Sequence, residues 1–356
     1  MNKPCVLLGL SGGVDSSVSA MLLKQQGYEV IACFLKCFSD TKNPLTNECS
    51  WREEKRSAQR IAAILKIPFI SIDVEKQYKN QVIKPLYTAY EQGLTPNPDI
   101  ACNTIIKFPW LRKIAEKYKC RYIATGHYAR ICSSSKGFQL LMGKDKTKDQ
   151  SYFLSQLTQK DLEKTIFPVG NLTKNQVRKI AEKNKFPNYN KQSTRGICFV
   201  GKVNMQTFLK KQLKQKQGSI TDNKGNIIGT HPGIQYFTIG QRIGTRLNII
   251  LNKEYAQKKY FIAKKIKQTN TIIAVPENHP LLKQKKIRII KFHQINPHLP
   301  LPKQLSARIR HLGKLYKGTL IKNVFTSKVP ITYVAEGQQI VLYKNQELVA
   351  SGEIRL

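Results

Sequence analysis

The sequence predicts an α/β fold in which a parallel sheet carries helices on both faces, followed by two small, mainly β domains. In the first part of the chain, short apolar runs typical of buried strands alternate with helical patterns. Beyond residue 218 the helical periodicity fades, and short alternating stretches separated by Gly, Asn and Pro indicate all-β modules. The predicted strands of the sheet are residues 5–10, 29–35, 69–74 and 122–126, and the predicted helices are residues 16–26, 53–65 and 79–92.

These patterns divide the chain into three predicted domains, because the organisation changes near residue 205. We expect an α/β domain at 1–204, a central mainly β domain at 205–268 and a C-terminal β-barrel at 269–356. Residues 296–302 form the most loop-like stretch. The predicted strands of the β domains include residues 260–264, 271–275, 287–292 and 339–343.

Length and composition restrict the class of protein. The chain has 356 residues, of which 41% are hydrophobic, enough for the cores of two or three domains. It contains no apolar run long enough for a membrane span, so no membrane partner is expected. The N-terminus enters a predicted strand at once, which leaves no room for a signal peptide. We therefore expect a cytoplasmic protein.

The chain is strongly basic, with 60 Lys and Arg against 22 Asp and Glu and a formal net charge of +38. Residues 201–356 hold 28 basic and 6 acidic side chains, so the shorter C-terminal part is the more charged. This excess favours a polyanionic partner, because neutralising phosphates releases counterions. Lys outnumbers Arg by 46 to 14 and Asn and Ile are abundant, so drift in genome composition explains part of the excess.

The cysteines do not form the pattern of a secreted disulfide framework, which is a short, cysteine-dense chain. Most of the thiols are expected to be buried as small apolar groups, with one or two reactive. Cys33, Cys37 and Cys49 lack the paired C-x2-C spacing of zinc ribbons, and the six histidines form no H-x-x-H pair, so no metal site is predicted from these residues. The eight cysteines are at positions 5, 33, 37, 49, 102, 120, 132 and 198.

The segment at 11–17 lies between the first predicted strand and the first predicted helix, and reads Ser-Gly-Gly-Val-Asp-Ser-Ser. Its glycines allow the backbone to approach a ligand closely. The helix N-terminus offers free N–H groups and a partial positive charge, and the serine hydroxyls add donors. The segment is neither a Walker A loop nor a G-x-G-x-x-G fingerprint. It predicts a phosphate-binding loop, with a ligand-free turn as the alternative.

Two further segments contain cysteines that suit a reactive thiol. Asp99 is expected to cap a helix after the turn at 95–98, which places Cys102 in the first turn of that helix. The helix dipole there lowers the pKa of a thiol, and Pro109 makes the helix short. Cys198 ends a small polar turn that begins at residue 193. Taken alone, each cysteine is more typical of a structural role.

Taken together, the motifs resemble a known family. The loop at 11–17 resembles the pyrophosphate loop of the N-type ATP pyrophosphatases, which adenylate a carbonyl or carboxylate and have an adenine-nucleotide alpha-hydrolase-like fold. With Cys102 and Cys198 added, the chain resembles the tRNA-specific 2-thiouridylases from about residue 3 to the C-terminus. The other matching segments are Asn97-Pro98-Asp99, Thr125-Gly126-His127-Tyr128-Ala129-Arg130, Lys148-Asp149-Gln150-Ser151-Tyr152-Phe153-Leu154, Gly196-Ile197-Cys198-Phe199 and Gly240-Gln241-Arg242.

The resemblance implies an ATP-dependent tRNA-uridine 2-sulfurtransferase. Such an enzyme adenylates the C2 oxygen of the wobble uridine (U34), releases pyrophosphate, and replaces the AMP-bearing oxygen with persulfide sulfur. The implied cofactors are ATP and Mg²⁺, and the implied partners are tRNA and a sulfur-relay protein or cysteine desulfurase. The uridine must leave its stack to react, which is easy in a splayed anticodon loop.

The same resemblance implies roles for individual residues. Cys198 would carry sulfur as a persulfide, and Cys102 would be the nucleophile that assists its release, through a Cys102–Cys198 disulfide or through hydrogen sulfide. The target uridine would be contacted by Asn97, Pro98 and Asp99. ATP would be bound by Gly9, Leu10, Ser11, Gly12, Gly13, Val14, Asp15, Ser16, Leu35 and Gly126, and other parts of the tRNA by His127, Lys148, Asp149, Gln150, Arg310, His311 and Gln338.

The chain departs from the family pattern at a few positions. Ser193 stands where an acidic residue is usual, Thr194 replaces a common serine, and Ile243-Gly244 stands where Lys-Gly is usual. Cys198 itself is intact, so these changes bear on local geometry rather than on activity. Two alternatives remain open. A different carbonyl-adenylating synthetase would need no cysteine pair, and a catalytically inactive tRNA-binding protein would need neither the loop nor the cysteines.

Overall fold

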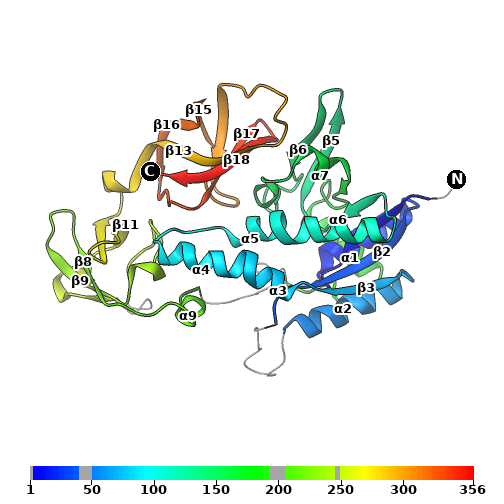
Figure 1. Ribbon diagram of the computed structural model, residues 1–356, viewed down its shortest axis with the longest axis horizontal. Helices are drawn as coiled ribbons and strands as arrows, with labels where there is room; N and C mark the ends of the chain where they lie inside the picture. Colours follow the sequence, from blue (N-terminus) through cyan, green and yellow to red (C-terminus); the bar gives the residue numbers. More distant parts are fainter. Residues whose placement is uncertain (1–2, 40–49, 193–204, 245–248) are drawn as a thin grey trace.

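The computed structural model describes residues 3–39, 50–192, 205–244 and 249–356 and confirms the predicted fold class (Figure 1). A parallel sheet with helices forms the first part of the chain, and two β-rich parts follow it. Cys49, Ser193, Thr194 and Cys198 lie outside the described residues, and so do the predictions that rest on them.

The N-terminal sheet is entirely parallel, with the strand order β3–β2–β1–β4–β7. In a parallel sheet the carboxyl ends of all strands lie at one edge, where ligands bind next to the strand at which the order reverses. Here β1 is that strand, with β2 on one side and β4 on the other. The strands are β1 (Cys5–Gly9), β2 (Glu29–Lys36), β3 (Phe69–Asp73), β4 (Tyr122–Ala124) and β7 (Thr165–Ile166).

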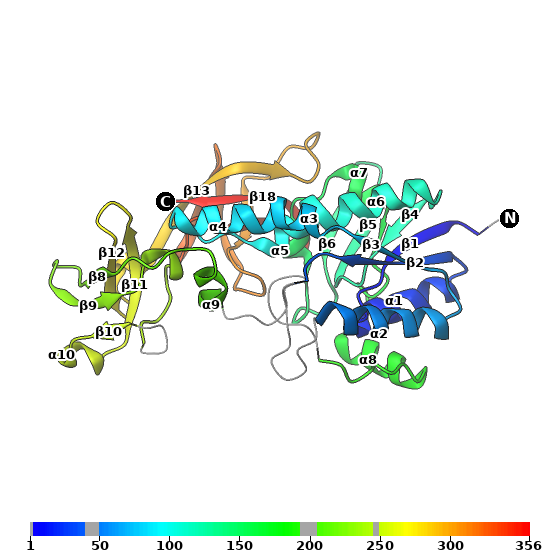
Figure 2. The ribbon, with the colours of Figure 1, turned by 60° about the horizontal axis from the view of Figure 1, so that its bottom comes forward.

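Side chains of the central strands alternate between two apolar layers, one on each face of the sheet. In β1, Val6 and Leu8 pack in one layer and Leu7 packs in the other. Because both faces are covered, the strand is a continuous apolar run rather than an alternating one. The helices α1 (Val14–Gln25), α2 (Ser50–Ile64) and α8 (Lys174–Lys183) cover the face of Val6. The helical run from α3 (Glu75–Tyr78) to α4 (Lys84–Glu91), together with α6 (Phe108–Lys117), covers the opposite face (Figures 1 and 2).

Two helical segments on the second face contain π-helical turns, η1 (Lys79–Ile83) and η2 (Cys102–Lys107). Each precedes an α-helix with proline in its first turn, Pro85 in α4 and Pro109 in α6. Proline lacks the N–H for a regular i→i−4 bond and its ring crowds the preceding turn, so a wider turn fits there. No helix among the described residues is long and apolar enough to cross a bilayer.

The predicted helices at 16–26 and 53–65 correspond to α1 and α2, and the one at 79–92 corresponds to η1 and α4. The helices α7 and α8 were not predicted. The α-helices are α1 (Val14–Gln25), α2 (Ser50–Ile64), α3 (Glu75–Tyr78), α4 (Lys84–Glu91), α5 (Pro98–Ala101), α6 (Phe108–Lys117), α7 (Gln159–Glu163), α8 (Lys174–Lys183), α9 (Met205–Lys210) and α10 (Lys253–Ala256). Short 3-10 turns are η3 (Ser151–Leu154), η4 (Ile234–Tyr236) and η6 (Pro280–Leu282).

The central β part is a single sheet with the order β10–β9–β8–β12–β11. The predicted boundary between residues 268 and 269 falls between β11 and β12, although these two strands pair antiparallel in the same sheet. We therefore propose that the central domain ends after β12. Its strands are β8 (Gly218–Thr221), β9 (Ile227–His231), β10 (Ile250–Leu251), β11 (Tyr260–Ile266) and β12 (Thr271–Pro276).

The C-terminal part, from β13 onward, is a closed antiparallel barrel, and the structure describes all of its residues. Its strand order is β13–β16–β15–β14–β17–β18, and pairing of β13 with β18 closes it. The loop between β13 and β14 contains the stretch 296–302, as predicted. The strands are β13 (Lys283–Gln294), β14 (Gln304–Arg308), β15 (Tyr316–Ile321), β16 (Val324–Thr332), β17 (Gln339–Lys344) and β18 (Glu347–Arg355).

A hairpin of the N-terminal domain extends the barrel sheet. It consists of β5 (Ala129–Ser134) and β6 (Gly137–Met142), and β6 pairs antiparallel with β18 through Leu140–Leu348 and Leu141–Glu347. The sequence analysis did not predict this hairpin. Because the pairing uses backbone hydrogen bonds between segments about two hundred residues apart in the chain, it fixes the barrel against the N-terminal domain (Figure 1).

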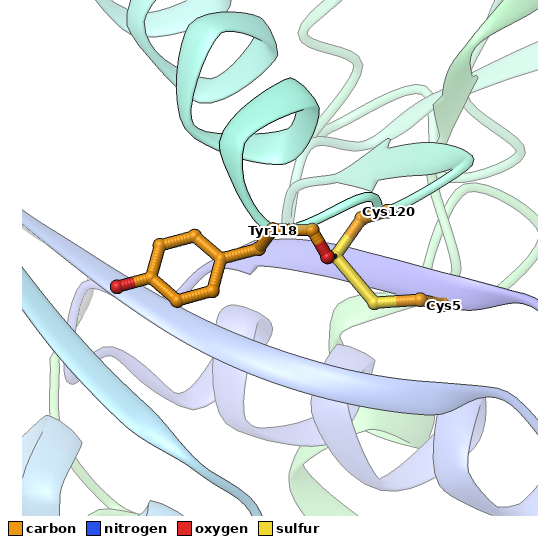
Figure 3. The surroundings of a disulfide bond; sticks show 3 residues. All are labelled: Cys5, Tyr118 and Cys120. Carbon is orange, nitrogen blue, oxygen red and sulfur yellow. Dashed lines mark hydrogen bonds between the residues drawn. A yellow bond between two sulfur atoms is a disulfide. The ribbon is translucent and has the colours of Figure 1, made fainter.

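Cys5 and Cys120 form a disulfide that the sequence analysis did not predict (Figure 3). The pairing of β1 with β4 places Val6 opposite Tyr122, and the Arg121 N–H donates to the Cys5 carbonyl oxygen at 3.0 Å. Cys5, the first residue of β1, and Cys120, two residues before β4, are thereby brought to a Cα–Cα distance of 4.5 Å. The disulfide lies at the amino end of β1, opposite the loop at 11–17.

We expect Cys5→Ser to lower the free energy of unfolding under non-reducing conditions by about 2–4 kcal/mol, because the bond closes a long loop in the unfolded chain. Urea denaturation with and without reductant measures this. Reductant should lower wild-type stability to that of the variant and leave the variant unchanged. Cys132→Ser, which removes an exposed free thiol, is the control and should change stability by less than about 0.5 kcal/mol. A wild type indifferent to reductant would contradict the prediction.

Candidate active site

The loop at 11–17 is a closed turn at the carboxyl end of β1. Ser16 Oγ donates to the Gly13 carbonyl oxygen at 3.0 Å and accepts from the Ser11 N–H at 3.3 Å. Ser17 Oγ also donates to the Gly13 carbonyl oxygen, at 3.0 Å. These bonds inside the turn hold its shape without a ligand.

Gly12 is the position in this loop that requires glycine. Its φ is +76°, and a Cβ there would lie 2.3 Å from the Glu54 carbonyl oxygen of α2. Its own carbonyl oxygen accepts from Ser57 Oγ at 2.9 Å and from Asn188 Nδ2 at 3.0 Å. The loop is therefore held by α2 and by the segment that follows α8, through contacts to Gly12.

The N-terminus of α1 is suited to an anion. Gly13 occupies the N-cap position, and among the described residues no side chain caps the first turn. The first N–H groups of a 12-residue helix therefore point out of the loop with the positive end of the helix dipole. Ser11 is exposed, and Gly13 and Asp15 are partly exposed, so a ligand can reach this end.

The neighbouring strand ends approach the same helix. A Cβ on Gly126, just after β4, would lie 2.7 Å from the Ser16 backbone nitrogen, so only glycine allows this contact. A Cβ on Gly9 would meet Leu111 at 3.3 Å. Leu35 is buried in the apolar layer at the end of β2. These predicted ATP-binding positions thus surround the carboxyl end of β1, and Gly126 contacts the loop directly.

Two residues that bond to the Asp15 carboxylate were not predicted from the sequence. The Lys174 ammonium lies 2.5 Å from Asp15 Oδ1, and the Tyr128 hydroxyl donates to the same oxygen at 2.7 Å. Thr173 and Gln176 form a capping box that starts α8 at Lys174. The T-x-x-Q spacing could have predicted this helix start, but nothing in the sequence indicated that its first residue would reach the loop.

The turn at 97–102 corrects the predicted helix cap. Asn97, not Asp99, is the N-cap of α5, and its Oδ1 accepts from the backbone N–H groups of Asp99 and Ile100, both at 3.2 Å. Proline favours the first helical position, so Pro98 takes that position and the cap falls on Asn97, two residues before the predicted Asp99. Cys102 is consequently the first residue after α5, beyond the first turn, and it begins η2 fully buried.

Asp149, a predicted tRNA contact, is fully buried and joins two domains. Its Oδ1 accepts from the backbone N–H groups of Gly143 and Ser151, both at 3.1 Å. Its Oδ2 accepts from Arg308 Nη1 of the barrel at 2.8 Å. The neighbouring Gln150 accepts the Tyr128 N–H at 3.0 Å, and Lys148 is partly exposed. The structure thus gives Asp149 a bridging position, with Lys148 the more accessible of the predicted contacts.

His127, another predicted tRNA contact, is buried between two aromatic rings. Its ring centroid lies 6.1 Å from that of Phe108 and 6.0 Å from that of Phe167, and Nδ1 lies 2.7 Å from Thr125 Oγ1. Burial, aided by the positive charge of Lys107, lowers its pKa well below the usual value, so the ring is neutral at physiological pH.

The barrel brings a further group of predicted contacts next to the helix of Cys102. The ring centroids of His311 and Phe153 are 4.2 Å apart, and Asn103 Nδ2 donates to the Phe153 carbonyl oxygen at 3.2 Å. Burial lowers the pKa of His311 to about 4, an effect that Asp149 partly opposes. Arg310 is exposed and donates to the Tyr333 carbonyl oxygen at 2.7 Å, whereas Gln338 is partly exposed near the end of β18.

Gly240 of the Gly-Gln-Arg segment joins the central domain to the barrel. Its φ is +82°, and a Cβ there would lie 2.3 Å from the Cβ of Tyr333. Phe261 of the central sheet stacks on the same Tyr333 ring, with centroids 5.5 Å apart. The segment therefore has a packing role between domains, which the sequence did not indicate.

We expect Gly12→Ala to weaken ATP binding and to destabilise the protein, because the new Cβ must displace the backbone of α2. Gly225→Ala is the matched control, since Gly225 also has a positive φ, of +93°, but no heavy atom within 4 Å of an added Cβ. The control should cost about 1–2 kcal/mol from backbone strain alone, and Gly12→Ala about 1–3 kcal/mol more. Denaturation and ATP titration measure the two effects. Equal losses in the two variants would rule out the close approach.

We expect Asp149→Asn to lower the free energy of unfolding by about 3–5 kcal/mol, because Arg308 would remain buried without its charged partner. Asp73→Asn breaks a pair whose carboxylate is 59% exposed and should cost less than about 1 kcal/mol. Denaturant titration gives stability, and tRNA binding is measured where both variants are fully folded. A loss of tRNA affinity with unchanged stability would instead identify Asp149 as a direct RNA contact.

Comparison with known proteins places the chain in a family. Models of a tRNA methyl transferase HUP domain, a tRNA methyl transferase PRC-barrel domain and an aminomethyltransferase beta-barrel domain match residues 4–202, 206–276 and 284–354, respectively. The second match ends at the last residue of β12. A 4-thiouridine synthetase–RNA complex with bound ATP is 16% identical over 56% of this chain and 46% of that chain, at a TM-score of 0.36, too distant to bear on the assignment.

Full-length relatives are much closer. The tRNA-specific 2-thiouridylase MnmA of Karelsulcia muelleri (strain GWSS) is 40% identical over 384 residues, which cover 98% of each chain. MnmA 1 of Geobacillus kaustophilus (strain HTA426) is 39% identical, over 99% of this chain and 96% of its own. MnmA of Nitrosomonas eutropha (strain DSM 101675 / C91 / Nm57) is 38% identical over 99% of each. The chain belongs to the tRNA-specific 2-thiouridylase family.

Proposed function

We propose that this chain uses ATP and persulfide sulfur to convert the wobble uridine of tRNA to 2-thiouridine. The observation that carries the proposal is identity of 38–40% to 2-thiouridylases over nearly the whole of both chains, in all three domains. Identity that extended only over the α/β domain would leave the substrate open, because a fold does not by itself fix a function.

The loop at the end of β1 supports the use of ATP. Its closed shape, the uncapped N-terminus of α1 and the contact of Gly126 with Ser16 suit a triphosphate beside the helix and an adenine beyond β4. The uridine C2 oxygen would attack the α-phosphorus, and the bond to the pyrophosphate group would break. The poor leaving group is thereby converted to AMP.

Mg²⁺ fits this site in the part of the chain that the structure describes. Both bonds to Asp15, from Lys174 and Tyr128, fall on Oδ1, so Oδ2 is left for a hard cation. Mg²⁺ is usually held by one or two carboxylates together with substrate phosphates, as one loop carboxylate would allow. When bound it would neutralise charge on the phosphates.

Sulfur transfer would use the two cysteines. The terminal sulfur of a Cys198 persulfide attacks C2 of the adenylated uridine, and AMP leaves with the former C2 oxygen. Cys102 then attacks the Cys198 sulfur, which breaks the S–S bond to the base and leaves a Cys102–Cys198 disulfide for a thiol reductant. The alternative is release of hydrogen sulfide by Cys102 before attack. The persulfide would come from a sulfur-relay protein or a cysteine desulfurase.

The arrangement of the domains supports recognition of the anticodon region. Asn97, Pro98 and Asp99 form the turn directly before Cys102, and the contact of Phe153 with His311 links this region to the barrel. Neutral aromatic and imidazole rings can stack on unpaired bases, while exposed cations such as Arg310 bind phosphates. We therefore expect the target base near the turn and the tRNA backbone along the β domains.

The decisive experiment is mass spectrometry of tRNA nucleosides after incubation with the full chain, ATP, Mg²⁺ and a persulfide donor. Wild type should form 2-thiouridine, and Cys198→Ser and Cys102→Ser should lower the yield by at least about 100-fold, as loss of a nucleophile does. Cys132→Ser removes an exposed thiol and should match wild type.

Other outcomes separate the alternatives. Cleavage of ATP to AMP without thiolation, unchanged in Cys198→Ser, would indicate a carbonyl-adenylating synthetase that uses another nucleophile. Binding of tRNA without any cleavage of ATP would indicate an inactive RNA-binding protein.

A further inference from the structure

Lys174 is a buried cation beside the phosphate-binding loop. It is the first residue of α8 and only 7% exposed. Its ammonium group lies 2.5 Å from Asp15 Oδ1, inside the loop, and Tyr128 donates to the same oxygen. Lysine is rarely buried unless an anion accompanies it. The position of Lys174 therefore needs an explanation beyond the packing of α8.

Among the residues that the structure describes, positive side chains outnumber carboxylates around Lys174. Lys148 and Arg178 lie near enough to lower its pKa, an effect smaller than that of burial, and Asp15 opposes both. The described carboxylates that contact Lys174 are Asp15 and Asp145, and the Asp145 carboxylate accepts the Lys174 backbone N–H at 2.9 Å. Three cations thus face two carboxylates, next to a helix N-terminus that is itself partly positive. This excess of positive charge suits a multiply charged anion.

We propose that Lys174 contacts the phosphates of ATP that leave as pyrophosphate, and that Asp15 and Tyr128 hold its ammonium group in position for this contact. The proposal rests on the proposed adenylation activity and deepens it. An ammonium group has three N–H donors, and Asp15 engages one side of it. Negative charge grows on the leaving pyrophosphate as the bond to the α-phosphorus breaks. A fixed cation at this position therefore stabilises the transition state more strongly than it stabilises bound ATP.

A purely structural role is the competing explanation. In that case the ion pair would only fasten α8 to the loop, and its loss would lower stability without a specific effect on catalysis. Val177 and Ala181 of α8 pack in the same apolar layer as α1, and Asn188, which follows α8, donates to the Gly12 carbonyl oxygen and to Ser17 Oγ. These contacts already hold α8 against the loop, which argues that Lys174 is not needed for docking alone.

The test is ATP–pyrophosphate exchange by the full chain with tRNA and Mg²⁺ and without a sulfur donor, so that only adenylation is measured. Lys174→Met should lower the exchange rate at saturating ATP by about 100-fold or more. Lys174→Arg, which keeps the charge, should recover a large part of the rate. Lys179→Met, an exposed lysine on the same helix, is the control and should leave the rate unchanged. Melting temperatures are recorded for every variant.

The proposal is overturned if Lys174→Met keeps the wild-type rate, or if its rate falls only in proportion to unfolded protein and Lys174→Arg does not restore it. Titration of wild type and variants with inorganic pyrophosphate gives an independent reading. We expect weaker binding in Lys174→Met and near-normal binding in Lys174→Arg. If wild type showed no exchange at all, the proposed adenylation would fail, and equal pyrophosphate affinity in wild type and Lys174→Met would then overturn the role of Lys174 separately.

Discussion

The buried ion pair between Asp149 and Arg308 is the interaction on which the relation between the domains depends. Both side chains are almost completely removed from solvent, so neither charge is tolerable without the other. The same carboxylate holds the backbone of the loop before η3 through Gly143 and Ser151. The shape of this loop and the position of the barrel are therefore set by one group. Together with the pairing of β6 and β18, it makes the barrel an extension of the α/β domain.

The three domains also meet at Thr95, two residues before the cap of α5. Its backbone N–H donates to the Glu336 carbonyl oxygen of the barrel at 2.9 Å, and its hydroxyl donates to Thr238 of the central domain at 3.4 Å. Gly337 allows the approach, because a Cβ there would lie 2.9 Å from the Thr95 nitrogen. The turn that begins at Asn97 is thus positioned by all three domains. A tRNA held by the β domains would be placed relative to this turn, not only to the barrel.

The sequence predicted β1 to β4 because their apolar runs alternate with helical patterns, which are strong local signals. The two-residue strand β7 was not predicted. The hairpin of β5 and β6 was missed because half of β5 is exposed, and because β18, the barrel strand that pairs with β6, lies at the far end of the chain. The disulfide and the contact of Lys174 with Asp15 were missed for a related reason. Both join residues more than one hundred positions apart, and only the folded sheet brings them together.

Local chemistry was predicted better than its exact position. The loop at 11–17 has the expected strand–loop–helix setting, and Gly12 is required by a close contact with α2 that no sequence pattern reports. The cap of α5 was placed two residues too late because both Asn97 and Asp99 are good cap residues, and Pro98 decides between them. The burial of His127 and Asp149 could not be predicted from the sequence, since polar side chains in the segments after strands are usually exposed.

The net charge of the chain depends only on its numbers of basic and acidic side chains and not on how the chain folds. With 60 basic and 22 acidic side chains, positive charges exceed negative ones by 38, so the acidic side chains of the protein cannot neutralise its basic ones. Buried charges must be paired, so the excess cations have to lie at the surface or face a bound anion. Residues 201–356 hold 28 basic and 6 acidic groups, so most of the excess belongs to the β domains. In the α/β domain, Lys174 lies buried beside the phosphate-binding loop, against Asp15. The two regions match the two anions of the proposed reaction, a long phosphate backbone and a compact triphosphate.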